Sequence, residues 1–343
     1  MLDNANYIAQ KDTADALGLA AIAHEQLRHG FSIPLVTPKT PIQNIVLAGM
    51  GGSALQAELA SVFPNLSVPL LICRNYNLPN FVNENTLVIA SSYSGNTEET
   101  LSALTEARNR KAIIAVMSGG GQLKAAALEA GELFVEIPKA VQPRMAVFYA
   151  YRALVEILIA YGLADTSAIV ELEAAADHLE KEVKNWKKDI PTANNPAKQL
   201  AQDVVGKTLI IYASSQMKPA AYKWKISANE NAKNTAWCNE LPEFNHNEFI
   251  GWTSHPVEKP FAVVDLISNF DHPRVQQRFE LTDRLLSGVR PHATTIEARG
   301  STPLQQLLYL VLFGDFVTLY MGILNGLDPS PVDLVERFKK ELG

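Results

Sequence analysis

The segment with the clearest chemical signature is SYSGNT at residues 92–97, which places three aliphatic hydroxyls and a glycine within six residues. It follows the apolar run Thr86–Ala90 and precedes a helix-like stretch, Glu98–Arg108. A strand that turns into a helix in this way directs N–H and O–H donors at one point, where the helix N-terminus adds about half a positive charge. We therefore expect a phosphate-binding loop; an ordinary serine-rich helix cap is the alternative. The hydroxyls belong to Ser92, Ser94 and Thr97.

A glycine-rich turn, GMGGSA at residues 49–54, follows an earlier strand-like run. It formally satisfies the dinucleotide pattern G-x-G-x-x-A, so an NADP-binding oxidoreductase is an alternative. The next strand ends without an acidic residue for a ribose diol, although Arg74 could face a 2′-phosphate. A hydroxyl-rich turn suits a terminal phosphomonoester better than a pyrophosphate, so we expect both turns to bind one phosphate group. The glycine turn would contribute Gly51, Gly52 and Ser53.

Strand-like apolar runs alternate with helix-like stretches through both halves of the chain. In the first half the runs are Asn44–Ala48, Pro69–Cys73, Thr86–Ala90, Ala112–Met117 and Leu133–Ile137. In the second half they are Thr208–Ala213, Phe261–Leu266 and Thr294–Ala298. This alternation predicts an α/β fold with two doubly wound, flavodoxin-like parallel-sheet domains, which bind ligands at the carboxyl ends of their strands. Both turns fall at such ends.

The turn-rich segment Pro191–Pro196 indicates a junction between the halves. We expect an N-terminal domain with the phosphate-binding loops at residues 1–163, a helical linker at 164–196 and a C-terminal domain at 197–343. Within the second half, Ala213–Met217 follows a strand-like run much as Ala90–Ser94 does in the first. This similarity is a faint sign of an internal duplication.

Composition narrows the function classes. The formal charge is −6 and the pI is about 5.7, without a basic block, which argues against nucleic acid as a partner. Cys73 and Cys238 match no metal or redox spacing, and the first residues lack the pattern of a secretory signal, so we expect a cytoplasmic protein. The segment Leu304–Leu324 is long enough to span a bilayer, but it contains Asp315, so a buried helix and no membrane partner are expected.

Later motifs add specificity to the two turns. They are QPR at 142–144, NENAK at 229–233, ELPEFNHNE at 240–248, and DPSPV at 328–332 followed by Lys339. Together with the turns they resemble the bifunctional phosphoglucose/phosphomannose isomerase family, which has sugar isomerase (SIS) domains; the turns alone would indicate only an SIS domain. The resemblance implies a cofactor-independent enzyme of glycolysis and gluconeogenesis. Its substrates would be glucose 6-phosphate and, as a second aldose, mannose 6-phosphate, interconverted with fructose 6-phosphate through a cis-enediol.

Such an isomerisation needs a base that moves a proton between C1 and C2, a group that opens the sugar ring, and donors for the enediolate oxygens. Glu230 is the candidate base, and Trp224 and Trp237, close in sequence, could supply apolar surroundings. His246 suits proton transfer at the ring oxygen because imidazole titrates near neutrality. A solvent-facing glutamate and a turn histidine bonded to backbone are the alternatives.

Arg144 and Lys339 complete the catalytic set. Arg144 opens the expected helix Met145–Gly162, where a cation is unfavourable, so we assign it to the enediolate oxygens. Lys339, beside Lys340, would by itself be a solvated helix end. The resemblance instead gives it a role in ring opening together with His246. The resemblance also implies that the histidine comes from the partner subunit, and hence a homodimer with shared active sites.

Two further alternatives depend on the same residues. Glu240, Glu243 and Glu248 lie near His246, and with His255 they could form a zinc site. No tight two-histidine spacing is present and enediol chemistry can proceed without a metal, so we expect neither a metal nor a cofactor. A non-catalytic phosphosugar-binding SIS regulator would not need the base. It would normally carry a DNA-binding module, for which the residues before the first strand are too few and too weakly basic.

Overall fold

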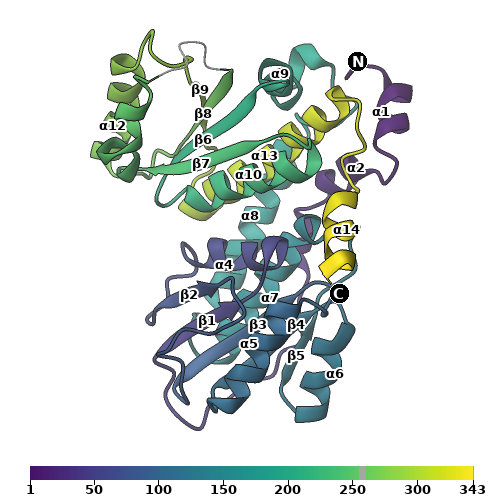
Figure 1. The fold of residues 1–343 in the computed structure, drawn as a ribbon, viewed down its shortest axis with the longest axis vertical. Helices are drawn as coiled ribbons and strands as arrows, with labels where there is room; N and C mark the ends of the chain where they lie inside the picture. Colours follow the sequence, from purple (N-terminus) through teal and green to yellow (C-terminus); the bar gives the residue numbers. More distant parts are fainter. Residues whose placement is uncertain (255–259, 343) are drawn as a thin grey trace. The chain divides into compact units, whose positions relative to one another are not determined.

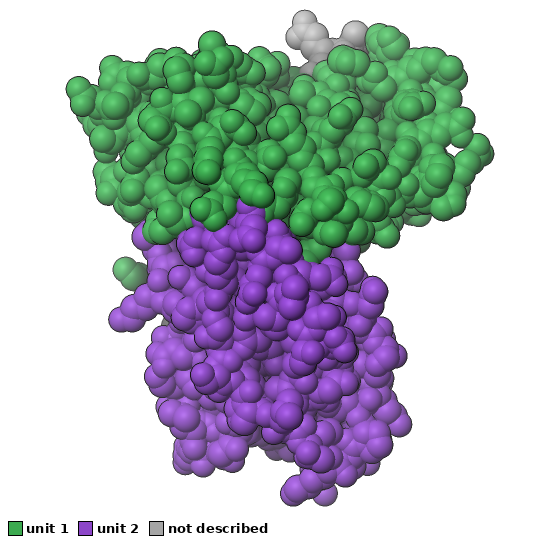
Figure 2. Space-filling model, turned by 180° about the vertical axis from the view of Figure 1, so that it is seen from behind, with its two compact units in different colours: residues 1–22, 178–343 green, residues 23–177 purple. Residues whose placement is uncertain are grey.

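The computed structural model describes residues 1–254 and 260–342, and the chain forms two compact units (Figure 2). Unit 1 comprises residues 1–22 and 178–343, and unit 2 comprises residues 23–177. The chain passes from unit 2 into unit 1 within α8 (Ser167–Val183), which lies in the expected linker. The first 22 residues, which the sequence places with the first half, belong instead to the unit built from the second half.

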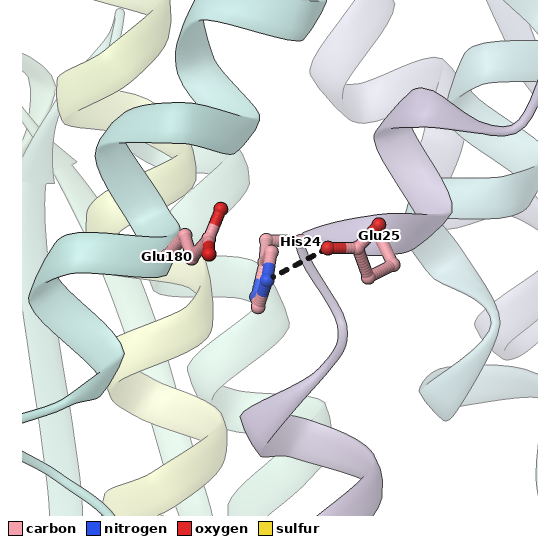
Figure 3. Close-up of side chains that lie close together, drawn as sticks. All are labelled: His24, Glu25 and Glu180. Carbon is pink, nitrogen blue, oxygen red and sulfur yellow. Dashed lines mark ion pairs between the residues drawn. The ribbon is translucent and has the colours of Figure 1, made fainter.

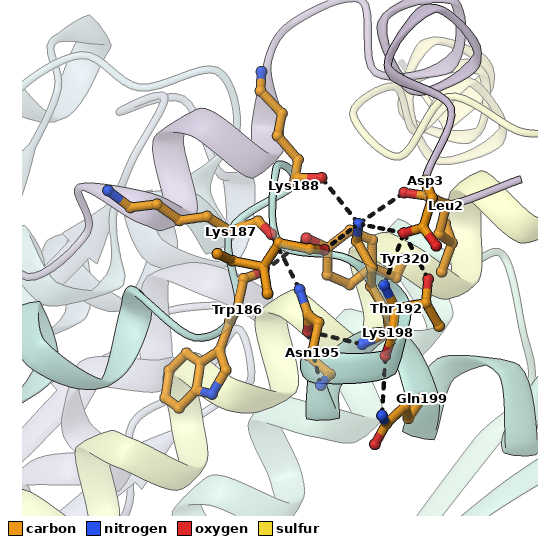
Figure 4. A network of polar contacts seen from close by, with 12 residues as sticks. Leu2, Asp3, Trp186, Lys187, Lys188, Thr192, Asn195, Lys198, Gln199 and Tyr320 are labelled. Carbon is orange, nitrogen blue, oxygen red and sulfur yellow. Dashed lines mark hydrogen bonds and ion pairs between the residues drawn. The ribbon is translucent and has the colours of Figure 1, made fainter.

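A buried lysine explains why the N-terminal segment joins unit 1. The ammonium of Lys198 is fully buried, and it donates hydrogen bonds to the carbonyl oxygens of Leu2 at 2.8 Å and Ile190 at 2.7 Å (Figure 4). It also pairs with the carboxylate of Asp3, at 3.2 Å. A buried ammonium without partners is costly, so the N-terminal residues stabilise unit 1 by supplying acceptors. The N-terminal segment continues into helices α1 (Ala5–Lys11) and α2 (Ala16–Ala21), and Lys198 lies in α9 (Pro196–Val204).

Unit 2 contains a five-stranded parallel sheet in the order β2-β1-β3-β4-β5 (Figure 1). This is the flavodoxin-like order, and it confirms the predicted fold class. All seven residues of β3 are buried because helices cover both faces of the sheet. The strands are β1 (Asn44–Ala48), β2 (Leu70–Cys73), β3 (Thr86–Ser92), β4 (Ile113–Ser118) and β5 (Leu133–Glu136). The helices are α3 (Glu25–Arg28), α4 (Leu55–Ala60), α5 (Glu98–Asn109), α6 (Gly121–Ala130) and α7 (Val147–Ala160).

Ion pairs hold the short helix α3 at the start of unit 2. His24 Nε2 lies 3.2 Å from the Glu25 carboxylate (Figure 3). The guanidinium of Arg28 contacts Glu25 at 2.5 Å and Asp177 in α8 at 2.6 Å. These contacts connect the first and last segments of the unit, whose sheet lies between them in sequence.

Unit 1 contains a four-stranded parallel sheet in the order β7-β6-β8-β9 (Figure 1). The strands are β6 (Thr208–Ser214), β7 (Ala236–Leu241), β8 (Phe261–Ile267) and β9 (Thr294–Glu297). The helices are α10 (Lys218–Asn231), α11 (Glu248–Gly251), α12 (Pro273–Leu285), α13 (Pro303–Leu324) and α14 (Asp333–Leu342). Strand β6 therefore occupies the position of β1, between the next two strands of its sheet. The segment Ala213–Met217 follows β6, which corresponds to β1, whereas the similar segment in unit 2 follows β3. The sequence similarity therefore relates strands that occupy different positions in the two sheets.

The long apolar segment is the core helix of unit 1, as expected. Helix α13 is long and apolar enough to cross a membrane by length and composition alone, but 89% of its most apolar stretch is buried inside the protein. Trp224 of α10 donates a hydrogen bond to the Leu310 carbonyl at 2.7 Å, and Gly314 leaves room for the indole ring. A side chain at Gly314 would place its Cβ 2.1 Å from the indole nitrogen. Close helix packing thus accounts for the apolar composition.

Candidate active site

The hydroxyl side chains that follow β3 converge on one another in unit 2. The hydroxyl oxygens of Ser92 and Thr97 are 2.7 Å apart, and that of Ser94 lies 3.4 Å from Ser92. Backbone N–H groups join the same cluster, because Gly95 donates to the Ser92 hydroxyl at 3.1 Å. The predicted loop is therefore a compact group of donors at the carboxyl end of a central parallel strand, where doubly wound sheets bind ligands.

The loop differs from an ordinary helix cap. Thr97 is the residue that precedes α5, yet its side chain makes no capping hydrogen bond to that helix. Its hydroxyl faces Ser92 instead. Gly95 makes this turn possible, because it has φ +71° and its Cβ would lie 1.8 Å from the carbonyl oxygen of Gly120. The positive end of α5 thus remains available to an anion beside the hydroxyls.

The glycine turn lies against the hydroxyl loop and carries Ser53 into it. The N–H of Tyr93 donates to the Ser53 hydroxyl at 2.9 Å. Residues Gly51–Ala54 form the 3₁₀ turn η1, which leads into α4. The structure thus brings together the four hydroxyls that the sequence predicts as phosphate ligands, although they come from two segments 40 residues apart.

A buried glutamine that sequence reasoning missed joins the two turns. The side-chain amide of Gln56 donates to the Ser91 hydroxyl and to the Ser53 carbonyl, each at 2.7 Å. Gln56 is fully buried in α4, among apolar neighbours in sequence. A glutamine between apolar residues was the signal in the sequence for such a contact, because a buried polar group requires hydrogen-bond partners.

Arg144 lies next to the glycine turn. It belongs to the 3₁₀ turn η2 (Pro143–Met145), and α7 begins at Val147, so the arginine does not open the helix as the sequence predicts. The arginine is buried, and its backbone nitrogen would lie 3.0 Å from a Cβ at Gly52. A side chain at Gly52 would crowd this approach, which places a guanidinium-bearing turn beside the predicted phosphate loops.

Unit 1 carries the other predicted catalytic residues. Glu230 lies half-buried near the end of α10. A polar seam fixes this helix against α13: Lys223 and Ser227 both contact the Asp315 carboxylate, the serine at 2.8 Å. One turn further, Asn231 donates to the Thr318 hydroxyl at 3.0 Å. These contacts hold α10, and therefore Glu230, in one register.

Of the two tryptophans expected near Glu230, Trp224 faces away from it. Trp224 lies in the interface of α10 with α13, and Trp237 lies on β7 with 60% of its surface exposed. Periodicity explains the first case, because Trp224 precedes Glu230 by six residues and the two side chains point to different faces of an α-helix.

Glu230 and His246 lie at opposite ends of the strands of unit 1, Glu230 at the amino ends and His246 at the carboxyl ends. Helix α10 ends beside the start of β6 and β7, where Asn234 donates to the Lys207 carbonyl at 3.0 Å. His246 is exposed in the 3₁₀ turn η4 (Glu243–His246), which follows the carboxyl end of β7. Strand β7 has six residues, which span about 20 Å at 3.3 Å per residue. The structure therefore does not bring these two residues of one chain together.

The segment that leads to Lys339 is anchored near Glu230. Lys233, just beyond the end of α10, donates to the carbonyl oxygens of Asp328 at 2.7 Å and Pro329 at 3.1 Å. Helix α14 follows, and Lys339 is exposed on it, 2.8 Å from the Glu336 carboxylate. Every described residue of this helix is exposed.

The residues of the possible zinc site have other partners. Glu240 pairs with Lys218 at 2.6 Å, Glu243 accepts a hydrogen bond from Asn247 at 2.5 Å, and Glu248 accepts one from Asn239 at 2.6 Å. The hydroxyl of the buried Tyr212 also donates a hydrogen bond to the Glu248 carboxylate. His255 lies outside the described residues. Arg74, which in the NADP alternative would face a 2′-phosphate, pairs instead with Glu58 at 2.5 Å.

Two parallel-sheet units, one with a hydroxyl-rich loop at its ligand-binding edge, define the class of SIS-domain phosphosugar proteins. A family model described as the bacterial phospho-glucose isomerase C-terminal SIS domain matches residues 193–342. The structure superposes on that of a glucose-6-phosphate isomerase like protein from Thermus thermophilus with a TM-score of 0.67 and 18% identity, which covers 99% of this chain and 98% of that chain.

Curated relatives extend the match to the whole chain. A bifunctional phosphoglucose/phosphomannose isomerase from Caldicellulosiruptor bescii is 35% identical over 324 residues, 91% of this chain and 93% of that protein. A second, from Aquifex aeolicus, is 32% identical and covers 88% of this chain and 91% of that protein. The chain belongs to the bifunctional phosphoglucose/phosphomannose isomerase family. The predicted family and enzyme class are thus confirmed.

Proposed function

We propose that this isomerase interconverts glucose 6-phosphate and mannose 6-phosphate with fructose 6-phosphate through a cis-enediol. The cluster of Ser92, Ser94 and Thr97 with Ser53 is the observation that carries the proposal, because it suits a terminal phosphate group. The names of the curated relatives support the same substrates. A non-catalytic regulator would need the phosphate-binding loop but not the acid–base residues described below.

The phosphate group would receive hydrogen bonds from the four hydroxyls and from backbone N–H groups of both turns. In the structure the Ser92 hydroxyl contacts those of Ser94 and Thr97, and the Ser53 hydroxyl accepts from a backbone N–H. Each hydroxyl can therefore rotate its proton toward a phosphate oxygen without a large movement of the backbone. Hydrogen bonds to a charged acceptor are worth about 1.5–3 kcal/mol each. The loop therefore contributes mainly substrate affinity.

Proton transfer between C1 and C2 is assigned to Glu230. Its carboxylate takes the proton from one carbon, and the resulting enediolate takes it back at the other. Positioned proton transfer of this kind accelerates a reaction by about 10²–10⁴-fold. The Arg144 guanidinium would stabilise the negative enediolate oxygens, and one preorganised donor is worth about 3 kcal/mol.

Ring opening is assigned to His246 and Lys339, and it requires a second chain. Glu230 and His246 of one protomer lie at opposite ends of strands about 20 Å long, so they cannot contact one hexose. A symmetric homodimer solves this problem, because each site can then take Glu230 from one protomer and the histidine from the other. We therefore propose shared active sites.

Helix α14 supports the same dimer. Its apolar side chains Leu334 and Phe338 are 80% and 65% exposed, on the helix that also carries Lys339. Exposed apolar faces of this kind mark interaction surfaces. A second copy of the chain would cover them and position the lysine at once.

Mannose 6-phosphate is proposed as a second aldose substrate for a chemical reason. Glucose and mannose differ only at C2, and once the ring is open, rotation about C2–C3 can present either C2 hydrogen to one base. We also propose a cytoplasmic location and roles in glycolysis and gluconeogenesis, which follow from these substrates.

The direct test is an assay of the chelator-treated, metal-free enzyme that follows fructose 6-phosphate formed from each aldose phosphate in turn. We expect turnover of both. Binding of the sugar phosphates without turnover would contradict the proposal and favour a regulator. Turnover of glucose 6-phosphate alone would contradict the second substrate only.

A further inference from the structure

A cavity of ≈ 570 Å³ lies in unit 1 between α12 and the strands β8 and β9. Its volume falls within the range of small-molecule sites. Strand β9, which contributes lining residues, forms the edge of its sheet (Figure 1), whereas unit 2 has the further strand β5 beyond β4. The cavity lies at the carboxyl ends of its strands, which is the ligand-binding edge of such sheets. None of the residues proposed for isomerisation lines it.

Carboxyl groups dominate the charge of this cavity. Four of its lining side chains are acidic, and among the described residues that line it there is no lysine or arginine. Neutral hydrogen-bonding groups, including Ser268, Asn269 and Gln276, fill much of the remaining surface. The acidic residues are Asp265 on β8, Glu280 and Asp283 on α12, and Glu297 on β9. This charge disfavours phosphates and other anions and favours a cation.

Asp265 is the buried member of this set. It is 3% exposed, and its carboxyl oxygen Oδ1 has no hydrogen-bond partner within the described protein. The other oxygen, Oδ2, lies 3.9 Å from the guanidinium of Arg290, beyond hydrogen-bond distance. The three guanidinium nitrogens of Arg290 also lack hydrogen-bond partners among the described residues. The two groups therefore face each other without a hydrogen bond, and Oδ1 of Asp265 can accept one from a donor in the cavity.

We propose that this cavity binds a primary aliphatic ammonium ion, with Asp265 as its principal acceptor and Glu297 at the exposed rim as a second. An ammonium group offers three donors, which match a set of carboxylates better than a neutral alcohol does. A metal ion fits less well, because the cavity is far larger than one ion. The alkyl part of the ligand would contact Ile267 and Phe279.

The acid–base properties of Asp265 give binding a characteristic pH dependence. The pKa of Asp265 is raised to about 7, chiefly by burial and in part by Asp283, against the opposing effects of Arg290 and His292. Glu280 and Glu297 also line the cavity around it. The ionised carboxylate binds an ammonium more tightly than the protonated form. Affinity should therefore increase as the pH rises from about 6 to about 8, with release of a proton.

The test is calorimetric titration of the full-length protein with 1,4-diaminobutane at constant ionic strength. We expect saturable binding that Asp265→Asn weakens at least tenfold, the loss of one charge-assisted hydrogen bond. Glu297→Gln on the exposed edge strand should weaken it about threefold, and this variant serves if the buried change prevents folding. Asp203→Asn, an exposed acid on α9, is the matched control for net charge and should bind as wild type does.

The neutral isostere 1,4-butanediol should not bind detectably. Equal binding of the diol and the diamine would overturn the proposal. So would the absence of saturable diamine binding, or equal loss of affinity in Asp203→Asn and Glu297→Gln. Because none of these readouts uses isomerase turnover, failure here is distinguishable from failure of the proposed function.

Discussion

The strands β3 and β8 hold the same position in their sheets, but hydroxyl groups follow β3 and a carboxylate follows β8. After β3 the chain presents the hydroxyls of Ser92, Ser94 and Thr97, whereas after β8 it leads through Ser268 to Asp271. The Asp271 carboxylate accepts hydrogen bonds from the Ser214 hydroxyl at the end of β6 and from the Ser268 N–H at 3.2 Å. In unit 1, therefore, the chain's own carboxylate occupies donors of the kind that unit 2 offers to a phosphate.

This difference teaches how one topology supports two roles. Unit 2 places neutral donors and a helix N-terminus at its ligand-binding edge, which suits a dianion. At the corresponding edge of unit 1 are carboxylates, and burial raises the pKa of Asp271 there. In the proposed mechanism unit 1 contributes Glu230 at the end of α10, Lys339 on α14 and His246 after the carboxyl end of β7. The predictions below separate binding in unit 2 from proton transfer in unit 1.

The largest effect should come from Glu230→Gln. This change removes the proposed base with little change in volume, so kcat should fall by about 10²–10⁴ while KM changes little. Steady-state kinetics in the fructose 6-phosphate assay measure both. Glu129→Gln, an exposed position on α6, is the matched control and should keep wild-type rates. Retention of most activity by Glu230→Gln would exclude it as the base.

In unit 2 the double change Ser94→Ala with Thr97→Val should act on affinity. Two donors to the phosphate are lost, so KM should rise at least about 100-fold. Thr105→Val is the control, because this threonine lies on the same helix and its hydroxyl bonds to the Leu101 carbonyl at 3.0 Å. An unchanged KM in the double variant would remove the loop from the phosphate site.

Exchange of two apolar residues of α14 should separate the protomers. Leu334→Ser with Phe338→Ser removes the exposed apolar face, so we expect dimer dissociation to be at least tenfold easier and specific activity to fall on dilution. Analytical ultracentrifugation measures the first effect. Leu128→Ser, at a residue of α6 that is 60% exposed, is the control. A wild-type protein that is monomeric at assay concentrations would contradict the proposed dimer.

The smallest effect concerns stability and pH. Asp265 stands two residues before the end of β8, where β3 has Ala90. Because burial raises the pKa of Asp265 to about 7, its protonated form stabilises the fold at low pH, and this contribution is lost as the pH rises from about 4 to about 7. In Asp265→Asn that loss should be absent. Denaturant unfolding at several pH values tests this, and equal slopes in both proteins would contradict it.

The parallel sheets and the hydroxyl-rich loop after β3 could be predicted from the sequence because each depends on local signals. Apolar runs such as β3, and small hydroxyl residues directly after them, specify a buried strand and a loop without reference to distant residues. Strand β7 was missed for the same reason. Its sequence, AWCNEL, is that of an edge strand with an exposed Trp237 and no continuous apolar run.

Long-range contacts determined what the sequence did not predict. The placement of residues 1–22 in unit 1 depends on Lys198, two of whose acceptors, Leu2 and Asp3, lie about 195 residues away in sequence. Likewise, the separation of Glu230 from His246 follows from the length of β7, which was itself not predicted. The chemical roles of these residues stay predictions, and their positions could be obtained only from the folded sheet.

The most direct test of shared active sites is complementation between two inactive variants, Glu230→Gln and His246→Asn, co-expressed so that their chains assemble at random. In a symmetric dimer with shared sites, each mixed dimer contains one site with both residues intact, so we predict about a quarter of wild-type activity. Each variant alone should be almost inactive. If the mixture is no more active than the separate variants, Glu230 and His246 do not act on one sugar from two chains, and the account is contradicted.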